Sequence, residues 1–132
     1  MSTHCGIAYK TEKGYETIYV HHDGYESYMW PMLTKNYNTE EKARDLVSLG
    51  DASFIDERMV PSRDSGHSFG NPEPGVCIFY HRDRGEDWSH VYPCHYTKDE
   101  LLSEYYYAYI WEDGKWTAYK NRRINTNVEN LH

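Results

Sequence analysis

The pair Asp113-Gly114 stands between two aromatic-rich segments, and it constrains the fold more than any other feature of the sequence. Asp-Gly favours a two-residue turn between antiparallel strands, because both turn positions adopt a positive φ. In the segment before the turn, alternate residues face opposite sides of a strand, with Tyr105, Tyr107, Tyr109 and Trp111 on one side and Tyr106, Ala108 and Ile110 on the other. The pattern predicts a β-hairpin made of residues 105–111 and 115–120.

A second hairpin is expected near the N-terminus. Residues 5–10 and 15–21 are rich in strand-forming residues, and Glu12-Lys13-Gly14 supplies the turn between them. A continuous apolar run at 76–81 predicts another strand, buried on both faces. Residues 82–87 are polar and turn-like, while 88–96 fit a short strand or irregular backbone.

Three helices are predicted. Residues 25–37 have an amphipathic spacing, and Pro31 is expected in the first helical turn, so that the regular helix begins near Trp30. The next helix has Asn38 as its N-cap, with Glu41 as the reciprocal partner, and ends before Gly50. The third opens at a capping box in Thr97-Lys98-Asp99-Glu100.

The predicted elements follow the order strand, strand, helix, helix, long loop, strand, helix, strand, strand. Because hairpins dominate, this order predicts an α+β fold with a mainly antiparallel sheet and two or three helices on one face. A chain of 132 residues has the size of one domain, so we expect a single domain over 1–132. Residues 51–75, rich in Pro, Gly and Ser, are expected to form a long loop, and residues 121–132 a frayed polar tail.

Composition excludes several classes of protein. The formal charge of −7 disfavours binding to a long nucleic acid. No apolar run approaches the roughly 18 residues of a membrane span, and no secretory signal is visible. The chain has three cysteines, an odd number, which indicates reduced thiols and a cytoplasmic location. The roles of Cys5, Cys77 and Cys94 stay open.

Two segments each place an imidazole near a carboxylate at the end of a predicted strand. They are His21-His22-Asp23 and His81-Arg82-Asp83-Arg84. If the strands were neighbours, His22, Asp23, His81 and Asp83 could bind a divalent metal or act as general acid and base. The simpler interpretation is that they are solvated polar residues at strand ends, so we predict no catalytic residue and no metal site.

The second of these segments is also the best candidate for ligand binding. Arginine binds phosphate through paired hydrogen bonds, and an aromatic ring stacks on a base. The candidate ligand-binding residues are Tyr80, His81, Arg82, Arg84 and Trp88. The alternative is that these arginines pair with nearby acidic residues, which are more numerous in the chain.

Several short segments are spread over about half of the chain: Ser2-Thr3 and residues 19–25, 33–37, 41–43, 49–53 and 80–87. Together they resemble a family of small, uncharacterised proteins from phages and mobile elements of gut-type bacteria. The chain departs from the family at His22, where the family usually has Trp, and at Pro31, where the family's helix lacks a proline. The resemblance implies a phage-like origin, but no activity and no catalytic residues.

Small, acidic, Tyr-rich proteins of this origin without a catalytic signature are commonly accessory factors that bind a host component. We therefore expect a non-enzymatic inhibitor of host antiviral immunity in the host-cell cytoplasm, which sequesters a nucleotide-type signal or masks a host defence protein. We expect no cofactor, and a homo-oligomer whose interface is the exposed Tyr-rich hairpin 105–120. The alternative is a small His/Asp-based phosphodiesterase or nuclease, with or without a metal.

Overall fold

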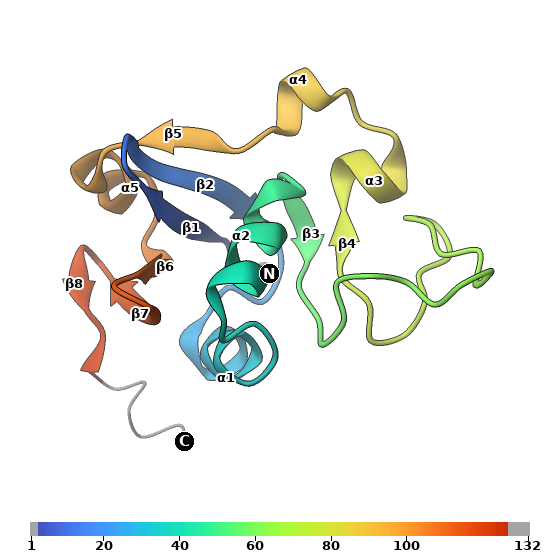
Figure 1. The fold of residues 1–132 in the computed structure, drawn as a ribbon, viewed down its shortest axis with the longest axis horizontal. Helices are drawn as coiled ribbons and strands as arrows, with labels where there is room; N and C mark the ends of the chain where they lie inside the picture. Colours follow the sequence, from blue (N-terminus) through green and yellow to red (C-terminus); the bar gives the residue numbers. More distant parts are fainter. Residues whose placement is uncertain (1–2, 127–132) are drawn as a thin grey trace.

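The computed structural model of the protein describes residues 3–126. Its strands form one sheet in the order β4-β3-β2-β1-β6-β7-β8, and β5 pairs with β2 beside β3 (Figure 1). Only the pairs β1–β6 and β2–β3 are parallel within the described sheet. The strands are β1 (Cys5–Thr11), β2 (Gly14–Val20), β3 (Ala52–Phe54), β4 (Ile78–Phe79), β5 (Cys94–Tyr96), β6 (Tyr107–Glu112), β7 (Lys115–Lys120) and β8 (Arg123–Ile124). The predicted α+β fold with a mainly antiparallel sheet is confirmed.

Both predicted hairpins form. Strands β6 and β7 pair without a break from Tyr107↔Lys120 to Glu112↔Lys115. The turn residues Asp113 and Gly114 have φ values of 55° and 75°, which is the conformation that a tight hairpin turn requires. Strands β1 and β2 form the N-terminal hairpin, and β1 then pairs in parallel with β6, which joins the two hairpins into one sheet.

The helices are α1 (Glu26–Asn36), α2 (Glu40–Ser48), α3 (Tyr80–Arg84), α4 (Trp88–Val91) and α5 (Lys98–Glu104). The two longest, α1 and α2, pack on one face of the sheet, where Leu33 and Leu46 meet Ile7 and Tyr109 in the larger core. Helix α5 opens with the predicted capping box. It covers the other face, where Leu101 packs on Ala8, Ala108 and Ile110.

Two helix starts differ from the prediction. Helix α1 begins at Glu26, so Pro31 lies inside it rather than in its first turn. The missing N–H of Pro31 leaves the carbonyl of Ser27 without its helical donor, and Ser27 is exposed, so water can take the donor's place. The N-cap of α2 is Thr39, not Asn38, because the Thr39 hydroxyl accepts the Lys42 N–H. Gly50, with φ of 84°, follows the end of α2 as predicted.

The region after α2 holds more structure than predicted. The expected loop 51–75 begins with β3. The expected strand 76–81 is reduced to β4, and the first half of the expected turn 82–87 belongs to helix α3. Segment 88–96 consists of α4 followed by β5. Of the expected frayed tail, 121–126 include the short strand β8, whereas 127–132 lie outside the described residues.

The hairpin 105–120 is not the exposed surface that the sequence analysis expected. Tyr109, Trp111, Trp116 and Tyr119 are all buried in the two cores. Tyr106 is the exposed large side chain of this hairpin. The alternating aromatic side chains therefore pack in the protein's own cores. Most of the surface that was expected to form the oligomer interface is not exposed.

Candidate functional site

The predicted ligand-binding residues lie on two short helices, α3 and α4, at one end of the molecule (Figure 1). The start of helix α3 is stabilised by the Asp83 carboxylate, which accepts the backbone N–H of Phe79 at 2.8 Å. Phe79 is the last residue of β4, so this bond fixes the helix directly to the end of the strand. Gly85 ends it in the left-handed conformation and donates its N–H to the His81 carbonyl. Asp87 then caps α4 by accepting the Ser89 N–H.

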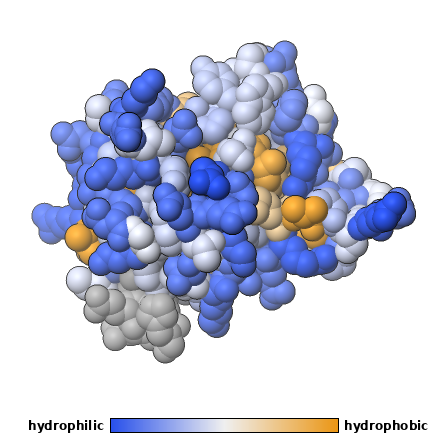
Figure 2. All heavy atoms as spheres, viewed as in Figure 1, coloured by the Kyte–Doolittle hydropathy of each residue, from blue (hydrophilic) through white to orange (hydrophobic). Residues whose placement is uncertain are grey.

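Three of the five predicted residues line a shallow groove between α2, α3 and α4. The groove has a volume of about 400 Å³ and is lined by Ser48, Leu49, His81, Arg82 and Trp88. The Trp88 side chain is 40% exposed and meets the His81 ring edge-on at 5.1 Å. A Cβ added to Gly50 would lie 2.9 Å from the Trp88 ring, so the ring packs directly on the backbone after α2. The face of the molecule drawn in Figure 2 is largely hydrophilic, and apolar residues are exposed on it in separate patches.

The Arg82 guanidinium is already bound within the protein. It donates to both oxygens of Asp83, at 2.8 and 3.0 Å, and to the carbonyls of Cys77 and Met59. It also stacks on the Phe79 ring at 5.0 Å. Four of its five N–H groups are thus in use, which does not fit the predicted role of a free fork for phosphate.

Tyr80 and Arg84 point to a different surface. The Arg84 guanidinium lies over the rings of Phe69 and Tyr80, at 5.1 and 5.9 Å. Its side chain is 53% exposed, and its nearest carboxylate, that of Glu86, lies 3.8 Å away. Arg84 is therefore the more accessible of the two predicted arginines, but it does not line the groove.

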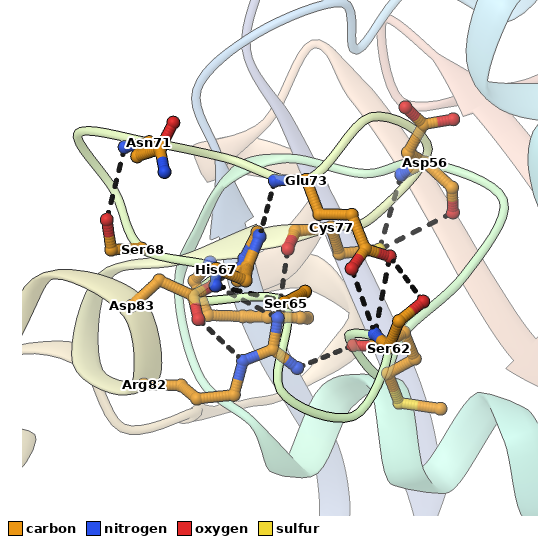
Figure 3. Close-up of polar contacts among 12 residues, drawn as sticks. Asp56, Ser62, Ser65, His67, Ser68, Asn71, Glu73, Cys77, Arg82 and Asp83 are labelled. Atoms are coloured by element: carbon orange, nitrogen blue, oxygen red, sulfur yellow. Dashed lines mark hydrogen bonds and ion pairs between the residues drawn. The ribbon is translucent and has the colours of Figure 1, made fainter.

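His67 is a buried residue that the sequence analysis missed. It lies in the loop between β3 and β4, and its Nε2 is 3.2 Å from Asp83 Oδ2, with both side chains at most 3% exposed (Figure 3). Its Nδ1 accepts the Glu73 N–H at 2.9 Å, so the proton of the neutral ring is on Nε2. The Glu73 N–H uses the lone pair of Nδ1, and Nε2 carries the proton that faces Asp83, so His67 has no lone pair left for catalysis. A lone histidine in a loop gives no sequence signal for this contact.

Asp83 is the centre of this cluster. Burial opposes its ionisation, but the donors of Arg82 and Phe79 outweigh burial and hold the pKa of the carboxyl below its usual value. The Phe69 N–H also donates to the Asp83 carbonyl at 2.8 Å. Asp83 thus fastens the loop to α3, and its oxygens are not available to a substrate or metal.

The structure does not bring the two His/Asp segments together. Strand β3 lies between β2 and β4, parallel to β2 and antiparallel to β4, with Ala52 opposite both Val20 and Phe79. The chain therefore leaves β2 and β4 at opposite ends, which puts His22 and His81 roughly 15 Å apart from strand geometry alone. In residues 3–126 no three His, Cys, Asp or Glu side chains are placed to hold a metal ion.

His21 and His22 instead belong to a polar cluster at the end of β2. The Tyr19 hydroxyl lies 2.6 Å from His21 Nδ1 and 2.9 Å from His4 Nδ1. Because His4 Nδ1 also meets the His21 carbonyl at 2.9 Å, it carries a proton, and the Tyr19 hydroxyl donates to His21. Burial, and then the neighbouring His22 and His4, lower the pKa of His21.

Asp51 joins this part of the sheet to the groove region. Its side chain accepts the Tyr19 N–H at 2.9 Å. On strand β2, Tyr19 lies between Thr17, which pairs with β5, and Val20, which pairs with β3. Its backbone binds Val91 of α4 and Tyr80 of α3. Burial raises the pKa of the Asp51 carboxyl to about 6, although the Tyr19 N–H acts in the opposite direction.

Comparison with known proteins gives no match to a family model, a curated protein or a solved structure. The resemblance to the phage family therefore stays a prediction. No helix in the described part of the chain has the length and apolar character needed to cross a bilayer.

Proposed function

We propose that this chain is a phage-type accessory protein that inhibits host antiviral immunity by binding and masking a host protein in the host cytoplasm. The observation that carries the proposal is the groove beside Trp88. A large aromatic side chain that is 40% exposed and flanks a groove is typical of the anchor residues that dominate protein interfaces. Arg82, held rigidly in the wall of the groove, adds a second residue type that is enriched there.

Masking of a protein is better supported than capture of a nucleotide. The guanidinium of Arg82 is engaged by Asp83 and two carbonyls, and Arg84 lies outside the groove. A chain of net charge −7 also repels a polyphosphate at long range. The phosphodiesterase or nuclease has less support, because β2 and β4 run in opposite directions, so that His22 and His81 follow them at opposite ends of the sheet, and because Asp83 is engaged. Self-association stays a prediction.

An infection assay tests the masking function. The chain would be expressed in bacterial strains that each carry one defence system, and phage plating would be counted. We expect plating to be restored in at least one strain by the unaltered chain, and lost with Trp88→Ala. The matched control is Tyr106→Ala, which removes another exposed aromatic side chain that does not line the groove and should keep the effect.

The same material separates the alternatives. Calorimetry with cyclic dinucleotides and ADP-ribose-type signals should give no heat; binding that releases intact ligand would replace masking by sequestration. Turnover that disappears in both His22→Ala and His81→Ala would instead support the enzyme. Equal restoration by Trp88→Ala and the unaltered chain would refute the role of the groove.

A further inference from the structure

We propose that the groove lined by Ser48, Leu49, His81, Arg82 and Trp88 receives one aromatic side chain that carries a hydrogen-bond donor, a tryptophan or a tyrosine of the partner. This inference rests on the proposed function, because it names the group by which the masked protein is held. It follows from the size of the groove, the unused nitrogen of His81 and the fixed guanidinium of Arg82.

The groove has the size and walls for a single ring. Its volume of about 400 Å³ is large enough for one large aromatic side chain. The Trp88 indole and Leu49 supply apolar walls from α4 and α2. Aromatic rings prefer offset or edge-to-face contact with such a ring, and His81 already meets Trp88 in this way from one side.

His81 provides the hydrogen-bond acceptor. Its Nδ1 lies 2.8 Å from the Glu86 carbonyl, and because a carbonyl only accepts, Nδ1 must carry the proton. In the neutral ring, Nε2 then has the lone pair, and no hydrogen bond within residues 3–126 uses it. The ring is held in one tautomer, so a residue that lines the groove carries an unused acceptor for an incoming N–H or O–H. A phenylalanine would leave this acceptor unsatisfied.

Arg82 provides a fixed positive charge in the same wall. Its four hydrogen bonds to Asp83, Cys77 and Met59 hold the guanidinium in place. A cation favours the electron-rich face of an indole or phenol. Since the group is already immobile, little side-chain entropy is lost when a ring binds beside it. Although Asp83 compensates its charge, the planar and immobile guanidinium still offers a flat surface on which an aromatic ring can stack.

Two isomeric probes test the inference without knowledge of the partner. 3-Methylindole has a free N–H, whereas 1-methylindole has the same size and no donor. The full chain would be titrated with each by NMR at pH 8, above the usual range of imidazole titration. We expect 3-methylindole to bind at least threefold more tightly, with the difference abolished in His81→Phe and both affinities lost in Trp88→Ala.

A second measurement covers the case in which His81→Phe does not fold. In the unaltered chain at saturation, the His81 Nε2 resonance should shift several-fold more with 3-methylindole than with 1-methylindole, because only the first donates a hydrogen bond to it. Equal affinity for the two probes, or binding that survives Trp88→Ala, would overturn the inference. Failure of the infection assay while the probes still discriminate would reject the masking function and leave the aromatic site intact.

Discussion

The β6–β7 hairpin and the segment from the loop after β3 through α3 are held together in different ways. In the hairpin, neighbouring residues set the turn at Asp113-Gly114, and side chains such as Tyr109 are buried on the sheet. In the loop and α3, the buried side chains are polar, and His67 and Asp83 meet across 16 positions. The first region depends on local conformation and apolar burial. The second depends on a few long-range polar contacts, so one substitution can undo it.

The largest effect that this comparison predicts is that of Asp83→Ala. The change removes the acceptor of the Phe79 N–H and the carboxylate that faces both Arg82 and His67. Loss of one partner from a buried charged cluster costs about 3 kcal/mol, because the remaining groups stay desolvated. We expect the free energy of unfolding, measured by urea titration, to fall by about this amount.

Glu86→Ala is the matched control for Asp83→Ala. Glu86 is also a carboxylate beside an arginine, but it is 3.8 Å from Arg84 and both side chains are more than a third exposed. An exposed pair of this kind contributes little, so the change should stay within about 0.5 kcal/mol. Similar losses for the two variants would show that the loop does not depend on the buried cluster.

The same difference between local and long-range contacts decides which parts of the fold could be predicted from the sequence. Both hairpins, the Thr97 capping box and the end of α2 at Gly50 are encoded by residues within a few positions of one another. The parallel pairing of β1 with β6 is not, because about a hundred residues separate the strands and no local pattern selects the partner.

The candidate site was predictable only in part. His81, Arg82 and Trp88 are named by their residue types, and the structure does gather them around one groove. The sequence could not show that the carbonyls of Met59 and Cys77 would surround Arg82. It also could not show that Asp83 would turn back to cap its own helix, since a polar Arg-Asp-Arg segment is typical of an exposed turn.

Gly114→Ala tests the local side of the comparison. Gly114 has φ of 75° with open space around its Cα, so an added methyl group meets no neighbour. The cost is conformational only, about 1–2 kcal/mol for an L-residue in the left-handed region. Thermal and urea unfolding should both show a loss of this size.

Gly70→Ala separates backbone strain from the loss of a glycine. Gly70 also has open space around it, but its φ is not in the left-handed region. The substitution there should be neutral or slightly stabilising, because alanine restricts the unfolded chain. If Gly70→Ala destabilised the protein as much as Gly114→Ala, the turn conformation would not be the cause.

The smallest predicted effect concerns Asp51, which connects strand β2 of the sheet to α3 in the second region, by binding Tyr19 through its side chain and Tyr80 through its backbone. Its pKa of about 6 is raised from 3.8 by burial. The folded state therefore binds this proton more tightly than the unfolded state. The stability that the bound proton adds below pH 4 is lost as the pH rises through 6.

Asp51→Asn keeps an acceptor for the Tyr19 N–H but cannot ionise. Relative to the unaltered chain, the variant should gain about 1 kcal/mol between pH 4 and pH 7, after allowance for the partial exposure of the group. Urea unfolding at both pH values measures this change. A stability difference between the two proteins that did not vary with pH would mean that Asp51 ionises as freely in the folded protein as in the unfolded chain, and that the junction between β2 and α3 is open to water.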